Sequence, residues 1–135
     1  MKKILLPIDG SARSLRTIHM IKQTHPLQDV ELTLLMVLPD QMHIDGQFER
    51  DRQLRKGTQE LETFASLLEG WKVETVLLRG SPGPEIVQFA KEEGFDALAM
   101  TRSSRGPLRR LGSVAAYVVK NAQFLDLFIL READA

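Results

Sequence analysis

The sequence predicts an α/β fold, an open five-stranded parallel sheet with helices on both faces. Two observations carry this prediction: five short apolar runs, and a helical pattern between each run and the next. The runs are too short for helices and apolar on both faces, which is typical of strands covered by helices on both sides. Strict alternation of strand and helix predicts parallel pairing through right-handed crossovers. The runs are residues 4–8, 32–38, 73–78, 97–100 and 127–130.

Four segments between these runs have helical spacing, at residues 11–22, 47–68, 84–93 and 113–121. The clearest is 47–68, whose apolar residues recur at steps of three, four and seven and so predict one buried stripe. A glycine interrupts this segment at Gly57 and is expected to weaken the helix. The predicted stripe consists of Leu54, Leu61, Phe64, Ala65 and Leu68.

The composition predicts one domain over residues 1–135, with 43% hydrophobic and 27% charged residues. Eighteen basic residues balance eighteen acidic ones, so the formal net charge is zero. Such a chain has no overall positive field to attract nucleic acid or an anionic membrane, and we expect neither as a partner. Any ligand must therefore be recognised by a local site.

The N-terminal apolar run is interrupted at Pro7 and Asp9, too early for the core of a signal peptide. No apolar stretch approaches the roughly 18 residues of a membrane span. The chain has no cysteine, which excludes disulfides and thiolate chemistry and fits a reducing compartment. We expect a cytoplasmic protein.

Ligands of open parallel sheets bind beyond the carboxyl ends of the strands, where the strand order reverses. In this sequence the segments that follow the first four strands are 9–11, 37–40, 79–84 and 101–113. We therefore expect the functional site to be built from these four segments.

The segment 101–113 is strongly basic and directly precedes a helix. Backbone N–H groups at Gly112 and Ser113 could receive an anion at the positive end of that helix, with arginine side chains as further donors. The alternative is a solvated basic loop in which Ser113 only caps the helix. The four arginines of the segment are Arg102, Arg105, Arg109 and Arg110.

Asp9 ends the first strand and is followed by Gly10 and Ser11. These residue types alone favour an Asx-type turn into the helix, with Ser11 as its N-cap. The functional alternative is that the Asp9 carboxylate accepts a hydrogen bond from a ribose or a base edge. Its predicted place at the switch in strand order strengthens that alternative.

The three histidines, His19, His25 and His43, do not cluster with carboxylates at metal-ligand spacings. None has a partner suggesting a nucleophile and base pair, so we assign them to the surface. We expect no metal site and no catalytic residue.

Several segments occur together in the order of one known family. Residues 4–11 look like that family's opening strand and turn, and residues 34–38 look like its second strand. Residues 80–82, together with Ile86, look like the turn after its third strand. Residues 95–100 lead through the basic loop to 111–114 and then 121–122. In this order and with these separations, the segments resemble the universal stress protein family across essentially the whole chain.

The resemblance implies a Rossmann-like fold of the adenine nucleotide alpha hydrolase type and a stress-response protein. It also implies a homodimer, often joined through the last strand, and in many members ATP, with Mg²⁺, as a ligand. The positions that match the family's nucleoside site are Asp9 and Val37. Those near its phosphates are Met100, Arg102, Gly112, Ser113 and Val114.

In ATP-binding members of that family, the phosphate loop reads Gly, two residues, Gly, nine residues, then Gly-Ser or Gly-Thr. If the last glycine of this pattern is aligned with Gly112, the two earlier glycine positions hold Ala99 and Arg102. If the loop is instead aligned to start after Met100, those positions hold Thr101 and Ser104. Neither alignment places glycine at these two positions, and glycine is the residue that lets the backbone approach phosphate closely. We expect ATP binding to be weak or absent. The alternative is an ATP-binding protein with slow hydrolysis or self-phosphorylation in the same crevice, with Ser113 or a nearby hydroxyl as the phosphate acceptor.

The apolar run at residues 124–130 predicts that copies of the protein associate with one another. As the last strand it is expected at a sheet edge, and a long apolar edge aggregates unless it is paired or covered. Pairing about a two-fold axis is the simplest closed arrangement and predicts a homodimer through this strand. The alternative is an edge covered by the chain's own helices.

Overall fold

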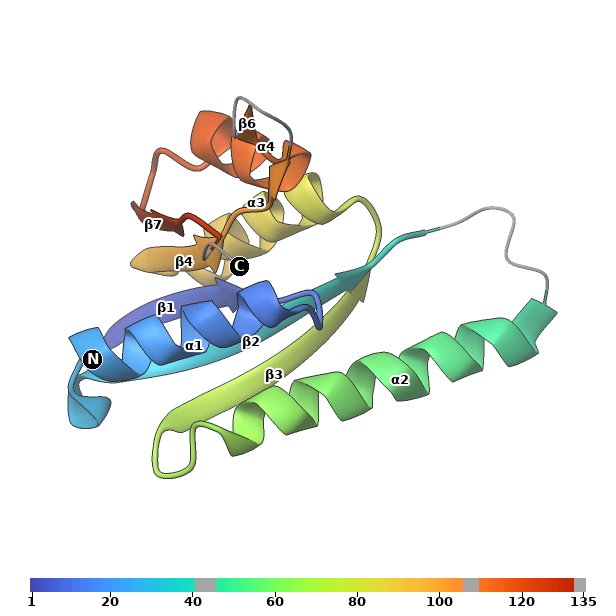
Figure 1. Ribbon diagram of the computed structural model, residues 1–135, viewed down its shortest axis with the longest axis horizontal. Coiled ribbons are helices and arrows are strands. Elements are labelled where there is room, and N and C mark those ends of the chain that lie inside the picture. The colour runs from blue at the N-terminus through green and yellow to red at the C-terminus, as the bar shows by residue number, and fades with distance from the viewer. Residues whose placement is uncertain (41–45, 106–109, 133–135) are drawn as a thin grey trace.

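The computed structural model describes residues 1–40, 46–105 and 110–132, and side chains outside 104–111 (Figure 1). The five predicted strands and four predicted helices are all present. The strands are β1 (Lys2–Pro7), β2 (Val30–Leu38), β3 (Lys72–Arg79), β4 (Ala97–Thr101) and β7 (Asp126–Leu130). The helices are α1 (Ala12–Thr24), α2 (Gly46–Ser66), α3 (Pro82–Glu93) and α4 (Ser113–Asn121), with a short 3₁₀ turn, η1 (Leu27–Asp29), before β2.

The five strands form one parallel sheet in the order β3-β2-β1-β4-β7. The chain first builds outward from β1 through β2 to β3, then returns so that β4 pairs with the other side of β1. The strand order therefore reverses between β1 and β4. In such sheets the crevice for ligands opens at the carboxyl ends of these two strands.

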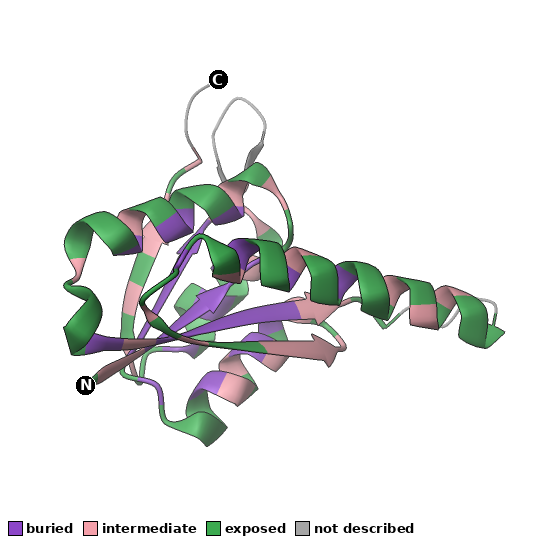
Figure 2. Ribbon diagram, turned by 90° about the horizontal axis from the view of Figure 1, so that it is seen from below, coloured by how far each residue is buried: buried purple, intermediate pink, exposed green. Residues whose placement is uncertain are grey.

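The helices cover both faces of the sheet, as predicted. On β1, Ile4 and Leu6 pack toward α1 and α2, whereas Leu5 packs toward α3 and α4, and none of the three has exposed surface. Ile18 and Ile21 of α1 are also fully buried. Figure 2 shows the buried residues gathered on the strands and on the inward side of each helix.

Helix α2 differs from its prediction in two respects. It runs without a break through Gly57, which is buried where a Cβ would lie 3.2 Å from Leu77 Cδ1 and 3.4 Å from Met36 Sδ. The glycine therefore permits close approach of the helix to the sheet. Leu54 was expected in the buried stripe but is 39% exposed. The reason is that the N-terminal half of α2 extends past the ends of the strands (Figures 1 and 2).

The basic segment also differs from a plain loop. Its backbone forms a small antiparallel pair, β5 (Ser104–Arg105) with β6 (Arg110–Leu111). Ser113 is not the cap of α4 but its first residue, and Gly112 is the N-cap. A Cβ at Gly112 would overlap the Ser103 hydroxyl, so a side chain at this position would require Ser103 to move.

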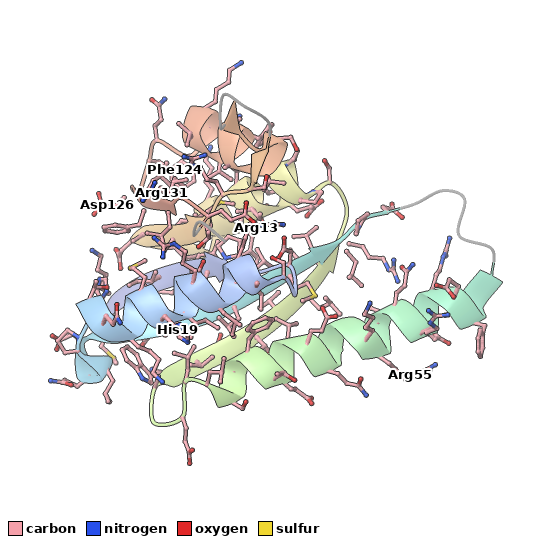
Figure 3. All side chains as sticks on the ribbon, viewed as in Figure 1. Arg13, His19, Arg55, Phe124, Asp126 and Arg131 are labelled. Carbon is pink, nitrogen blue, oxygen red and sulfur yellow. The ribbon has the colours of Figure 1, made fainter. Side chains whose placement is uncertain are left out.

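Strand β7 lies at an edge of the sheet, as the sequence predicts. Phe128 on this strand is 37% exposed and meets the His25 ring edge-on, with 6.4 Å between the ring centroids. Phe124, just before the strand, is also exposed and is labelled in Figure 3. None of the helices in the described ranges is both long and apolar enough to cross a membrane.

Candidate functional site at the carboxyl edge

A cavity of about 520 Å³ opens at the carboxyl edge of the sheet, beside the switch in strand order. All four predicted segments contribute to its walls, through Asp9, Val37, Pro82 and Thr101. The walls come from both sides of the sheet, because α1 and α2 line it together with the first residues of α3 and α4. The cavity has a size typical of small-molecule sites.

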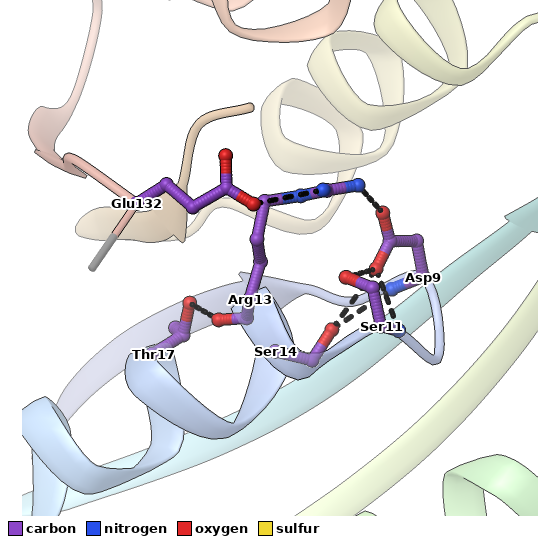
Figure 4. Close-up of polar contacts among 6 residues, drawn as sticks. All are labelled: Asp9, Ser11, Arg13, Ser14, Thr17 and Glu132. Atoms are coloured by element: carbon purple, nitrogen blue, oxygen red, sulfur yellow. Dashed lines mark hydrogen bonds and ion pairs between the residues drawn. The ribbon is translucent and has the colours of Figure 1, made fainter. Parts of the chain in front are cut away.

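Asp9 closes the turn between β1 and α1, as Figure 4 shows. Its Oδ1 accepts a hydrogen bond from the Ser11 backbone N–H at 3.0 Å, which confirms the predicted Asx turn. The Ser11 hydroxyl donates to the same oxygen rather than capping α1. The Ser14 hydroxyl donates to Oδ1 at 3.3 Å and accepts from the Asp9 N–H at 3.1 Å. Gly10, with φ of +81°, provides the left-handed backbone that the turn requires.

The second oxygen of Asp9 is also engaged. Arg13, one turn into α1, donates from Nη2 to Asp9 Oδ2 at 3.0 Å and from Nη1 to Glu132 Oε1 at 3.3 Å (Figure 4). Burial of the Asp9 carboxyl opposes ionisation, but the hydrogen bonds from Ser11 and Arg13 and the Arg13 charge outweigh it, so its pKa is lowered. Asp9 is therefore ionised at neutral pH, with both oxygens already accepting hydrogen bonds.

Two buried threonines meet at the base of the cavity. The hydroxyl oxygens of Thr17 on α1 and Thr101 on β4 lie 2.9 Å apart, and the residues are 1% and 8% exposed. Thr101 occupies the first glycine position of the family's phosphate loop when that loop is aligned after Met100. A side chain thus stands in the cavity wall where that alignment places a bare backbone.

Three of the seven residues predicted from the sequence line the cavity, namely Asp9, Val37 and Val114. Met100 is 7% exposed and packs in the core against α3 and α4. Gly112 and Ser113 precede Val114 at the start of α4 but are not among the lining residues. Arg102 is half-buried outside the lining, and its N–H donates to the Leu130 carbonyl at 2.8 Å.

The helical walls of the cavity were not among the residues predicted from the sequence. The available signal was polar residues on the inward stripe of a helix, where apolar residues are expected. They are Arg13, Ser14 and Thr17 on α1, and Gln53, Lys56 and Glu60, together with Gly57, on α2.

The histidines take no part in this cavity so far as the structure describes them. His19 is exposed on α1, and His25 is half-buried with its Nδ1 2.8 Å from the Thr24 hydroxyl. Burial and the charge of Lys2 lower the pKa of His25. His43 lies outside the described residues. Within the described ranges, no group of three or more His, Asp or Glu side chains is arranged to hold a metal ion.

Comparison with known proteins gives a consistent result. The family model described as "Universal stress protein family" matches residues 1–127. Universal stress protein MJ0531 of Methanocaldococcus jannaschii is 33% identical over 135 aligned residues, which cover 90% of this chain and 77% of the relative. The solved structure of hypothetical protein MJ0577 from the same organism is 27% identical, with a TM-score of 0.84 and coverage of 99% and 98%.

A universal stress protein family protein of Arabidopsis thaliana, solved with AMP bound, has the same fold. Its TM-score is 0.77 at 22% identity, and the match covers 98% of this chain and 93% of that one. The five-stranded parallel sheet with helices on both faces is therefore the architecture that these proteins share.

Proposed function

This chain belongs to the universal stress protein family, and we propose that it is a stress-response binding protein whose carboxyl-edge cavity takes an adenine nucleotide. One observation carries the proposal. Asp9 and Val37, which match the family's nucleoside positions, and Val114, which matches a phosphate position, line the same cavity of about 520 Å³. The AMP complex of the Arabidopsis protein, which has this fold, supports the choice of ligand class.

We further propose that the cavity binds ATP weakly or not at all. The N-terminus of α4 would be the natural place for phosphate, because free backbone N–H groups and the positive end of the helix dipole meet there. In this chain the Ser103 side chain packs against Gly112 at that end, and Thr101 adds a side chain to the cavity wall. These side chains reduce the exposed backbone that could surround a triphosphate.

The described geometry favours binding over hydrolysis or self-phosphorylation. A general base must be within hydrogen-bond reach of the proton it removes and free to accept it. Both oxygens of Asp9 already accept hydrogen bonds from Ser11 and Arg13, and Ser113 does not line the cavity. If ATP enters with Mg²⁺, we expect its phosphates to supply most of the ligands to the ion.

We also propose a homodimer through β7. This strand is paired with β4 on one side and forms the sheet edge on the other, with Phe128 partly exposed. Two copies related by a two-fold axis would bury these edges together. The proposal concerns assembly alone and does not depend on nucleotide binding.

The nucleotide site is tested by calorimetric titration of AMP into the wild-type protein and into Asp9→Asn. This change keeps an acceptor for the turn but removes the charge, and a hydrogen bond to a charged group contributes about 1.5–3 kcal/mol. We expect AMP affinity to fall about tenfold or more. The control is Asp40→Asn, an exposed aspartate outside the cavity. Equal affinity of all three proteins would contradict the assignment of Asp9.

A further inference from the structure

Helix α2 presents a polar stripe to the cavity. Gln53, Lys56, Gly57 and Glu60 all line it, at spacings that place them on one face of the helix. Beyond Glu60 the inward residues of the same helix are apolar and buried, at Leu61 directly after it and at Phe64 one turn further on. The change from polar to apolar coincides with the boundary between the cavity and the core.

Within the described ranges, the protein does not engage the polar side chains of this stripe. In the described part of the chain, Gln53, Lys56 and Glu60 form no hydrogen bond and no ion pair. Glu60 is nevertheless half-buried, and the described residues leave no fully buried side-chain oxygen or nitrogen without a partner, so its carboxylate faces the cavity rather than the core. The stripe therefore presents free hydrogen-bonding groups to whatever occupies the cavity.

Glu60 lies directly over the turn at the end of β1. Its carboxylate is so close to Gly10 that a side chain at Gly10 would overlap Glu60 Oε2. Gly57, one turn earlier, packs against Met36, the residue before Val37. The stripe thus flanks the two strand ends that carry Asp9 and Val37.

The free carboxylate of Glu60 complements the engaged carboxylate of Asp9. Both oxygens of Asp9 already accept hydrogen bonds from within the protein, which leaves Oδ2 room for one more, whereas the Glu60 carboxylate accepts none from the described residues. A nucleoside brings hydrogen-bond donors in its ribose hydroxyls and, for adenine, in its exocyclic amine. A half-buried carboxylate is a strong acceptor for either donor.

We propose that α2 forms the second wall of the nucleoside end of the site, and that Glu60 selects ligands presenting a hydrogen-bond donor at the end of β1. This inference rests on the proposed nucleotide function. The donor is a ribose hydroxyl or the exocyclic amine of the base. Ligands that present acceptors there are disfavoured, because two acceptors facing each other leave both unsatisfied.

The experiment measures the affinities of three ligands for four proteins. The ligands are AMP, 2′,3′-dideoxy-AMP, which lacks the ribose hydroxyls, and IMP, which has a carbonyl in place of the amine. The proteins are the wild type, Glu60→Gln, Glu60→Ala and the control Glu62→Gln, an exposed glutamate on the same helix that does not line the cavity. Thermal melting shows that each variant is folded, and Glu60→Gln preserves shape if Glu60→Ala does not fold.

We expect AMP binding to weaken about tenfold or more in Glu60→Ala, less in Glu60→Gln, and less than about twofold in the control. The analogue lacking the relevant donor should lose no affinity in Glu60→Ala, which identifies the hydroxyl or the amine. Equal AMP affinity of Glu60→Ala and the wild type would overturn the inference and leave the proposed function intact. Equal losses for all three ligands would also overturn donor selection. No AMP binding by the wild type would overturn the proposed function, and the inference with it.

Discussion

Arg13 holds the Asp9 carboxylate across one turn of α1, with Nη2 3.0 Å from Oδ2. The same guanidinium reaches Glu132, so the segment after β7 is tied to the first turn of α1. A second contact supports this attachment, because Arg16 Nε donates to the Arg131 carbonyl at 2.7 Å. Arg13 thus connects the turn at the cavity to the segment beyond the edge strand.

The first prediction concerns the ionisation of Asp9. Arg13→Gln removes the guanidinium, so the pKa of Asp9 should rise toward its ordinary value of about 3.9. NMR titration of the Asp9 carboxyl measures this pKa directly. Arg55→Gln is the control, since Arg55 is exposed on α2 (Figure 3). An Asp9 pKa unchanged by Arg13→Gln would show that the Ser11 hydrogen bonds alone lower it.

The same pair predicts a pH dependence of stability. The folded pKa of Asp9 lies below its unfolded value, so the stabilisation is fully present above about pH 4 and is lost as pH falls through the folded pKa. Its size should be below about 1 kcal/mol, because the Asp9 side chain is 56% exposed and solvent screens the pair. Urea unfolding of wild type and Arg13→Gln should give a difference at pH 7 that shrinks below about pH 4.

Thr17 and Thr101 should be strongly coupled in stability. Thr17→Val leaves the Thr101 hydroxyl buried without its partner and should cost about 1–3 kcal/mol. The double variant Thr17→Val with Thr101→Val should cost less than the sum of the two single changes, because no orphaned hydroxyl remains. Urea unfolding of the four proteins gives the coupling energy. Strictly additive effects would contradict the direct hydrogen bond.

Gly57 should tolerate only a small side chain. Gly57→Ala should change stability little, because the gain in helix propensity offsets a Cβ placed 3.2 Å from Leu77 Cδ1. Gly57→Leu should destabilise by about 1–3 kcal/mol, since overpacking forces the helix away from the sheet. Thr58→Leu, at the next and exposed position, is the matched control for thermal melting. A neutral Gly57→Leu would refute the close approach of α2.

The proposed dimer predicts a change of mass on altering β7. Phe128→Lys places a charge on the exposed face of the edge strand, a change that opposes strand pairing between molecules. Light scattering should then report a dimer for the wild type and a monomer for the variant. Phe48→Lys controls for loss of surface hydrophobicity, because Phe48 is 76% exposed on α2. A monomeric wild type would rule out the dimer.

Local patterns were sufficient to predict most of the fold. The apolar runs predict strands because a parallel sheet covered on both faces needs consecutive apolar residues, as at Ile4, Leu5 and Leu6. Leu54 was wrongly placed in the core because spacing shows which residues share a helix face, but not where the sheet beneath that face ends. Gly57 was interpreted as a weak point because its packing partners, on β2 and β3, are distant in sequence.

Only the part of the candidate site that lies at the strand ends could be predicted from the sequence. The rule for open parallel sheets directed attention to Asp9 and Val37 from topology alone. The contribution of Glu60 to the cavity wall depends on how α2 crosses the sheet. The contribution of Arg13 depends on which oxygen of Asp9 its guanidinium reaches. Such tertiary relationships leave no local signal beyond a polar residue at an inward position.

The most direct test of the account is a calorimetric comparison of AMP and ATP binding to the wild-type protein, with Mg²⁺ present. We predict that AMP binds in the cavity and that ATP binds no more tightly, because Thr101 and the packing of Ser103 on Gly112 limit contact with additional phosphates. Micromolar ATP binding that is at least about tenfold tighter than AMP binding would contradict it, by showing that the extra phosphates contribute about 1.4 kcal/mol or more.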